Sequence, residues 1–325
     1  MKFLSSALAA GAALALSLPG EAAAQSITMP QDPASLDPEI IVKGERPLTP
    51  KEIGNAVDHL TRRTGLFAAI ARFETPVCVL VIGLGERADE KIAARIRENV
   101  AAVGLQVAKS PKCRPNAIMI ITNDMQGTFD SIYHKRQFLI GLPDLREYSL
   151  ITLKAQLRDK KPAVSWSTLG FGALQNGALL AGQPQSAGFW GWNASRGAPL
   201  GGNLRDSAVL LVDFQRLNGV HVHQLADFAT VHLLGSPRTA TDPANAGVPT
   251  ILSLFEEGPS KAPQRLTTFD RAYLCGLYRI RTRARNEVVN LASNARMKQN
   301  MLDVYDSECV RVGAPHLGAA SAPGK

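Results

Sequence analysis

The chain has 325 residues, 45% of them hydrophobic, and a formal net charge of +8 at pH 7. This length and composition exclude a fully disordered chain and predict a globular protein large enough to bury a sizeable core. The basic balance would suit nucleic acid, but the densest basic run, 279–285, has no interleaved aromatic residues. A solvated face is therefore the preferred interpretation, and no nucleic-acid partner is expected.

The first 24 residues have the features of a secretory signal peptide. Lys2 supplies the charged start, an apolar run follows from Phe3 to Leu18, and Ala22–Ala24 supplies small residues for cleavage after Ala24. The alternative is an uncleaved N-terminal anchor. We expect a periplasmic or secreted protein, and no later stretch is long and apolar enough to span a membrane.

Composition divides the rest of the chain into three parts. Residues 25–50 are rich in Pro, Asp and Glu and predict an extended linker. Residues 51–310 contain alternating helical and strand patterns without an internal repeat, which predicts a single α+β domain. Residues 311–325 are small and polar and predict a disordered tail.

The first half of the domain predicts helices and buried strands in alternation. Thr49 and Glu52 form a capping box around Pro50, which should begin a helix that reaches about Ala71. The apolar runs and the amphipathic pattern that follow predict strands at 77–82, 105–108 and 116–122 and a helix at 89–103.

The second half predicts an edge strand and a strand followed by a helix. Alternation predicts an edge strand at 162–168, and an apolar run predicts a strand at 207–213. Helical patterns cover 222–234, 268–278 and 286–301.

The Gly-rich stretch 170–202 predicts long loops or a hairpin and carries Trp190 and Trp192. Two tryptophans at this spacing share one side of an extended strand. They could form a platform for a sugar or a peptide, or they could pack over the core.

Four cysteines in an exported chain predict two disulfide bonds. Three pairings are possible. We favour Cys78–Cys113 and Cys275–Cys309, because each pair closes a short segment that resembles one structural unit. No C-x-x-C sequence occurs, so neither a thiol-redox motif nor a cysteine zinc site is expected.

The helix predicted at 222–234 has the spacing of a metal site. His223 and Asp227 are four residues apart, as are the two zinc histidines of H-E-x-x-H, and both residue types bind zinc. Gln224 stands where the general base would be, and an amide cannot accept a proton at any useful pH. We prefer a His–Asp pair on a solvated face over a metal site, and His221 with His223 forms a second, weak H-x-H possibility.

His232 lies near the centre of the apolar face of the same helix, opposite His223. We therefore expect a core histidine bonded to a backbone carbonyl. A zinc hydrolase would need a third ligand besides His223 and Asp227, from Asp242, Glu256 or Glu257.

A second motif follows the first predicted strand. Gly83 to Ala88 matches G-x-G-x-x-A, the dinucleotide fingerprint. Glu86 would repel the phosphate, and the acidic residue expected about 20 positions later is missing. A tight strand-to-helix turn explains the glycines better.

The stretch from Ala208 to Tyr278 combines an apolar strand, a "QLADFAT" helix and a later Phe-Asp helix that ends in Leu-Tyr. It resembles a family of exported proteobacterial proteins of unknown function. In the first half, "RFETPVCVLVIG" and "RPNAIMIIT" are similar to that family too. The resemblance implies a zincin-like, metalloprotease-like fold with a degenerate metal-binding helix and no demonstrated activity.

These observations together predict a mixed-sheet α+β domain that binds a peptide or an envelope protein without catalysis. The binding surface would include Gln224, Trp190 and Trp192, in a cleft between residues 162–168 and the helix at 222–234. No cofactor is expected. The competing hypotheses are a metal-dependent hydrolase, with zinc at His223 and Asp227, and a structural envelope protein held to lipid or polysaccharide by its basic surface.

Overall fold

The computed structural model describes residues 47–62, 70–110, 112–141, 149–171, 174–175, 178–179, 203–235, 237–238, 243–279, 294–305, 307 and 309. These residues belong to one compact unit of the chain. The predicted signal peptide and disordered tail, nearly all of the predicted linker, and both Trp190 and Trp192 lie outside the described residues.

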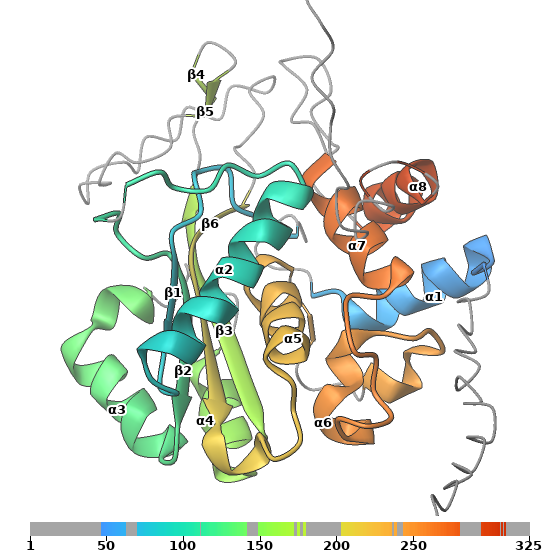
Figure 1. Cartoon of the computed structure of the whole chain (residues 1–325). Helices are drawn as coiled ribbons and strands as arrows, with labels where there is room; N and C mark the ends of the chain where they lie inside the picture. Colours follow the sequence, from blue (N-terminus) through green and yellow to red (C-terminus); the bar gives the residue numbers. More distant parts are fainter. Residues whose placement is uncertain are drawn as a thin grey trace, which may run out of the picture. The chain divides into compact units, whose positions relative to one another are not determined.

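A four-stranded mixed sheet forms the centre of this unit (Figure 1). Its order is β1 (Val79–Ile82), β2 (Ala117–Thr122), β6 (Asn203–Asp213) and β3 (Ala163–Phe171). The first three strands are parallel, and β3 pairs antiparallel with β6 at the edge of the sheet. The predicted mixed sheet and the predicted edge strand are thus confirmed.

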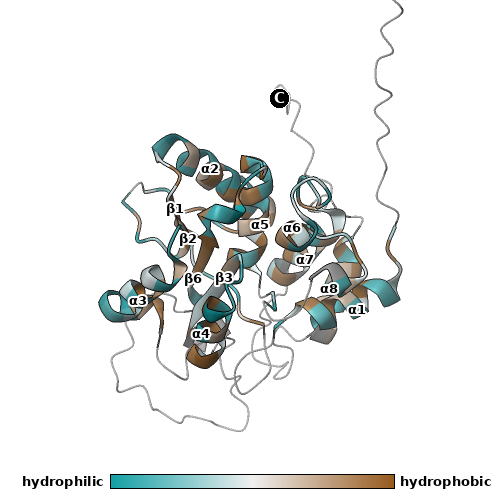
Figure 2. Ribbon diagram, turned by 90° about the horizontal axis from the view of Figure 1, so that it is seen from below, coloured by the Kyte–Doolittle hydropathy of each residue, from teal (hydrophilic) through white to brown (hydrophobic). Residues whose placement is uncertain are grey.

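Helices cover both faces of the sheet (Figures 1 and 2). Helices α2 (Glu86–Ala102) and α5 (Val222–Leu234) lie on one face, and α3 (Met125–Lys135) and α4 (Leu150–Arg158) lie on the other. Successive strand residues alternate between these faces. Met119 and Leu210 therefore belong to the α2–α5 core, whereas the neighbouring residues Ile118 and Leu211 belong to the α3–α4 core.

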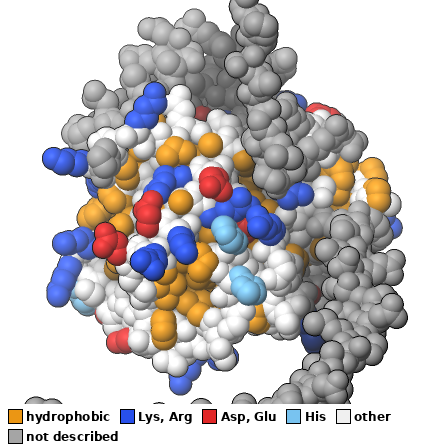
Figure 3. Space-filling model, in the orientation of Figure 1, with side chains coloured by type: hydrophobic (Ala, Val, Ile, Leu, Met, Phe, Trp, Pro, Cys, Tyr) orange, Lys and Arg blue, Asp and Glu red, His pale blue; other side chains and the backbone are white. Residues whose placement is uncertain are grey.

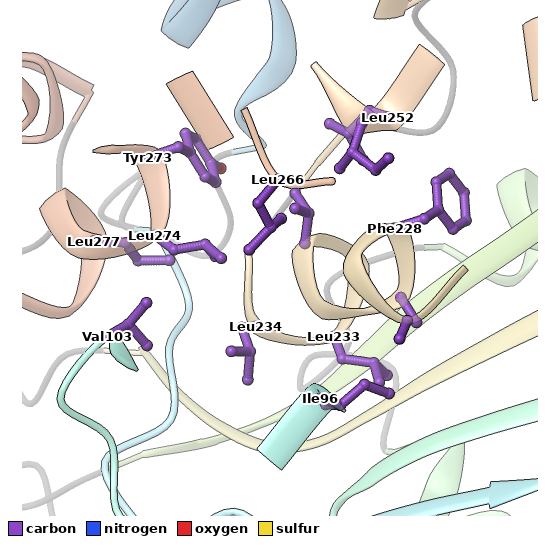
Figure 4. Close-up of a cluster of buried hydrophobic side chains, with 14 of the residues drawn as sticks. Ile96, Val103, Phe228, Leu233, Leu234, Leu252, Leu266, Tyr273, Leu274 and Leu277 are labelled. Atoms are coloured by element: carbon purple, nitrogen blue, oxygen red, sulfur yellow. The ribbon is translucent and has the colours of Figure 1, made fainter. Parts of the chain in front are cut away.

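A further group of helices packs beside α5 and extends the larger core (Figure 4). It contains α1 (Pro50–Leu60), the short α6 (Leu254–Glu257), α7 (Thr268–Arg279) and α8 (Asn294–Val304). Leu233 and Leu234 of α5 point into the same cluster as Leu274 and Leu277 of α7. As a result, α5 has neighbours on the sheet side and on the far side.

Several elements differ from the prediction. Helix α3 lies where none was expected, and α8 ends at Val304, beyond the predicted end of the helix at 286–301. The first helix ends at Leu60 and not near Ala71, because Thr61 forms a bridge with Pro237 and the Arg238 N–H donates to the Leu60 carbonyl. The strand predicted at 105–108 is a single bridge between Val77 and Val107. In the Gly-rich stretch, β4 (Leu174–Gln175) pairs antiparallel with β5 (Ala178–Leu179).

Both predicted disulfide bonds are confirmed. Cys78–Cys113 joins the chain just before β1 to the segment before β2, and Cys275–Cys309 joins α7 to the chain after α8. Two disulfides fit an exported protein. Within the described residues, no helix has the length and apolar character needed to cross a membrane.

Candidate functional site

Helix α5, where the metal-site spacing lies, is almost entirely buried. It begins after His221 and ends at Gly235, as the sequence predicts, and all its side chains from Gln224 to Leu234 are buried. A Cβ on Gly235 would lie 2.6 Å from the Val231 carbonyl oxygen, so the end of the helix has no room for a side chain. The prediction that one face of this helix is solvated is therefore wrong for every position after His223.

Asp227 shows why that expectation fails. Its side chain has no exposed surface, and its carboxylate accepts from Arg95 Nε at 2.9 Å and Nη2 at 3.3 Å. It also accepts from Asn99 Nδ2 at 2.8 Å and from the Leu266 N–H at 3.0 Å. Helix α2 and the segment before α7 thus enclose the predicted polar face, and Asp227 pairs with Arg95 and not with His223.

The guanidinium of Arg95 is held by this pairing. Burial alone would lower the pKa of Arg95, but the hydrogen bond to Asp227 and its negative charge outweigh that effect and raise the pKa. The raised pKa keeps the guanidinium charged where it lies against the buried side chain of Asp227. The pair is a structural clamp between α2 and α5.

Gln224 is also a structural residue and not part of a binding surface. It is fully buried, and its Nε2 donates to the carbonyl oxygens of Pro259 and Pro263, both at 3.0 Å. The side chain in the position of a general base therefore fixes the loop that passes over the helix. The expectation that Gln224 contacts a ligand is wrong.

His232 confirms the expectation of a core histidine, with a different partner. Its Nδ1 lies 3.0 Å from the hydroxyl of Ser165 on β3, and its ring packs 4.4 Å from that of Phe228. Burial lowers the pKa of His232 to about 3, so the ring is neutral at ordinary pH. Because Ser165 and His232 are both buried, the cleft predicted between β3 and α5 is closed at this point.

His221 and His223 are exposed at the start of α5. Among the residues that the structure describes, no group of three His, Cys, Asp or Glu side chains is placed to hold a metal ion. Glu256 and Glu257 therefore do not complete a site with His223 and Asp227, and Asp242 lies outside the described residues.

The glycines of the dinucleotide-like motif form the tight strand-to-helix turn that the sequence favours over a nucleotide site. Gly83 has φ 131° and comes so close to β2 that a Cβ would lie 2.1 Å from the Ile121 carbonyl oxygen. Asp89 accepts from the N–H groups of Gly83 and Leu84 at 3.1 and 3.0 Å. Two backbone donors of this turn are thus occupied by a side chain of the protein itself.

The carboxyl edge of the sheet offers a more exposed surface, which the sequence analysis did not identify. The chain leaves β1 for α2 on one face and leaves β2 for α3 on the other, and such a divergence is where α/β sheets commonly bind ligands. After β6, Phe214 opens a short 3-10 helix that runs to Arg216, and its side chain is 44% exposed.

Hydrogen bonds on both sides fix the position of Phe214. Asp213 caps the 3-10 helix by accepting from the Gln215 N–H at 2.9 Å, and its own N–H donates to the Pro162 carbonyl at 2.9 Å. Gln215 Nε2 donates to Asn123 Oδ1, beyond β2, at 3.1 Å. The loop therefore holds an aromatic ring in solvent on a well-bonded backbone.

The segments that meet at this end of the sheet also carry exposed basic side chains and histidines. The β3–β6 register pairs Ala163 with Val212, so Lys161 lies opposite Phe214 one step beyond the strands. Lys161, Arg216, His221 and His223 are all exposed. We call Phe214 and these four residues the edge site. One signal in the sequence could have revealed it. Phe214 is an aromatic residue directly after a buried strand, at a position where the in–out alternation of strand side chains no longer applies.

The chain was compared with protein-family models, with curated proteins and with solved structures, and no match was found.

Proposed function

We propose that this protein is a non-catalytic binding module of the cell envelope that holds an extended peptide segment of a partner protein at the edge site. The zincin-like fold stays a prediction that rests on the sequence resemblance. The observation that favours binding over catalysis is the structural role of the polar side chains of α5. Its buried polar side chains, Gln224, Asp227 and His232 among them, hold neighbouring elements together.

The edge site has the properties of a binding anchor. Aromatic side chains contribute most when they are held in place before binding, because little conformational entropy is then lost. The bonds of Asp213 and Gln215 fix the backbone that carries Phe214, which lowers the entropy lost when the ring binds. The flanking Lys161 and Arg216 favour a partner segment in which acidic residues adjoin an apolar one.

The chain contains a matched control for testing this proposal. Phe138 is 52% exposed and Phe214 is 44% exposed, but Phe138 lies in the 3-10 helix after α3, away from the edge site. A library of displayed peptides would be selected against the purified mature protein, and the enriched peptides would be measured against Phe214→Ala and Phe138→Ala. We expect Phe214→Ala to weaken binding about tenfold or more and Phe138→Ala to leave it unchanged.

Two results would overturn the proposal. One is enrichment of no peptide at all, and the other is equal binding of the enriched peptides to both variants. Lys161→Glu adds a second readout, because reversing one flanking charge should slow association with acidic peptides and reduce the salt dependence of binding.

The competing hydrolase hypothesis has its own direct test. The mature protein would be purified without chelator or affinity tag, beside His223→Ala, and its metal content measured by mass spectrometry. Near-stoichiometric zinc that disappears in the variant would replace the binding proposal with metal chemistry.

A further inference from the structure

The helix layer on the other face of the sheet carries a concentration of positive charge. The described segments 125–141 and 149–161 contain six Lys or Arg residues and two aspartates. One of those aspartates, Asp130, accepts a hydrogen bond from Gln126 at 3.0 Å, and the other, Asp159, lies beside Arg158. By contrast, α2 on the opposite face carries four basic and four acidic residues.

The exposed side of α4 is a regular stripe. Ile151, Lys154 and Arg158 are spaced i, i+3 and i+7, so they lie on one side of the helix, and all three are exposed. Ile151 is 83% exposed, the highest value among the large apolar side chains of the described residues. An isolated exposed apolar residue is ordinary, but this one stands in line with two cations.

Helix α3 continues this surface. Lys154 Nζ lies 5.3 Å from the centre of the Tyr133 ring, so the two helices meet at their outer sides. We call Tyr133, Ile151, Lys154 and Arg158 the α3–α4 surface.

We propose that the α3–α4 surface binds the headgroup layer of an anionic phospholipid membrane, with the Ile151 side chain entering the boundary of the acyl chains. Lysine and arginine near an anionic bilayer are attracted to its surface potential, and an apolar side chain between them gains by leaving water. Ile151 distinguishes a bilayer from an anionic polysaccharide, which offers charge but no hydrocarbon. This surface lies on different elements from the edge site, so the proposal is independent of the proposed peptide binding.

The test is co-sedimentation of the mature protein with vesicles. One set consists of phosphatidylcholine alone, and the other of equal parts phosphatidylcholine and phosphatidylglycerol. We expect binding to the anionic set only, and release as the salt concentration rises. Lys154→Gln combined with Arg158→Gln should weaken binding about tenfold or more, and Ile151→Ser about fivefold.

A matched control removes the same charge from the other face. Arg87 and Lys91 are exposed on α2 at the same i, i+4 spacing as Lys154 and Arg158. The double variant Arg87→Gln with Lys91→Gln should bind anionic vesicles within about twofold of the unmodified protein. Phe214→Ala should also bind like the unmodified protein, which separates lipid binding from peptide binding.

Three outcomes would overturn the proposal: no binding to anionic vesicles, equal weakening by the two double variants, or unchanged binding of Ile151→Ser. Soluble dextran sulfate provides the polysaccharide arm of the experiment. If it binds the protein and Ile151→Ser has no effect on vesicle binding, the surface recognises charge alone. Urea unfolding of each variant shows that the changes at these exposed positions leave the fold intact.

Discussion

The two helix layers of the sheet are held by different interactions. The α2–α5 layer contains a buried ion pair, Arg95–Asp227, and hydrogen bonds from Asn99 and the Leu266 backbone. The α3–α4 layer packs on the sheet through apolar side chains such as Phe129 and Leu153 and leaves its Lys and Arg side chains in solvent. Polar residues on a helix therefore do not by themselves identify a surface, because a third layer of structure can cover them.

The exposed surfaces of the two layers also differ, in the balance of their charges. On the side that Figure 1 faces, which carries α2, acidic and basic side chains are interspersed (Figure 3). The segments that form the α3–α4 layer have three basic residues for each acidic one. We expect changes in the first layer to affect mainly stability and exposed changes in the second to affect mainly association.

The largest expected effect is in the apolar layer. Phe129 is fully buried, and its ring packs edge-on against that of Trp166, with the ring centres 5.6 Å apart. Phe129→Ala should lower the free energy of unfolding by about 4 kcal/mol, because it removes a large buried side chain and leaves a cavity. Urea denaturation measures this loss, and a loss below about 1 kcal/mol would show that the layer is not tightly packed.

A comparable loss of unfolding free energy should follow from removing the buried carboxylate of the α2–α5 layer. Asp227→Ala removes the carboxylate to which Arg95, Asn99 and the Leu266 N–H donate. Arg95 keeps its bond to Glu98 and Asn99 its bond to Thr230, and the substitution should cost about 3 kcal/mol. Asp130→Ala is the control, because this half-buried carboxylate on α3 accepts only from Gln126 among the residues that the structure describes, and it should change stability by less than about 0.5 kcal/mol. Equal effects of the two substitutions in urea denaturation would contradict the difference between the layers.

The pH dependence of stability should also originate largely on the α5 side. The pKa of His232 is lowered by burial to about 3, so the native state resists protonation that the unfolded chain accepts. Stability from this group is complete above pH 6.5 and is lost as the pH falls toward 3, by up to about 1.4 kcal/mol per pH unit. His232→Gln should remove this dependence, which unfolding curves at successive pH values would show.

Asp270 changes the free energy of unfolding with pH in the opposite direction. Burial raises its pKa to about 6, although hydrogen bonds from Thr250, Ile251 and Thr267 act against the shift. This group therefore adds stability as the pH falls from 6 toward 3.8. In His232→Gln this term remains, so stability should rise on mild acidification. A fall in the variant equal to that in the unmodified protein would exclude His232 as the cause.

The smallest expected effect is at the Tyr133–Lys154 contact. An exposed cation–π pair contributes about 0.5 kcal/mol, so Lys154→Gln should barely change the urea midpoint. Its effect on anionic vesicles should be larger than its effect on stability. A loss of stability above about 2 kcal/mol would assign Lys154 a structural role instead.

Local signals in the sequence predicted much of the fold. The Thr49–Glu52 capping box is present, with the Glu52 N–H donating to the Thr49 hydroxyl and the Thr49 N–H to the Glu52 carboxylate. The bounds of α5 match the prediction, because they depend on local signals: the apolar periodicity of the helix and Gly235 at its end. The two disulfides were predictable because each joins segments about one structural unit apart.

The candidate sites were much less predictable. The zinc spacing of His223 and Asp227 was visible, but the partner of Asp227 is Arg95, 132 residues earlier in the chain. A polar residue among the apolar positions of α2, such as Asn99, is the one sign of that contact, and it does not say which residue it meets. The edge site depends on which loops meet at one end of the sheet.

The sequence by itself thus determined where the four strands of the sheet and helices α1, α2, α5 and α7 form, and how α1 begins and α5 ends. It also favoured the correct pairing of the cysteines over two alternatives. These features depend on caps, periodicity and short loops, whose energies act over a few residues or a single structural unit. The tertiary structure alone decided that the polar side of α5 is buried, that Phe214 is exposed beside Lys161, and that the positive charge gathers on α3 and α4. Those outcomes depend on which distant segments pack together, because burial, ion pairing and surface charge are properties of contacts between elements.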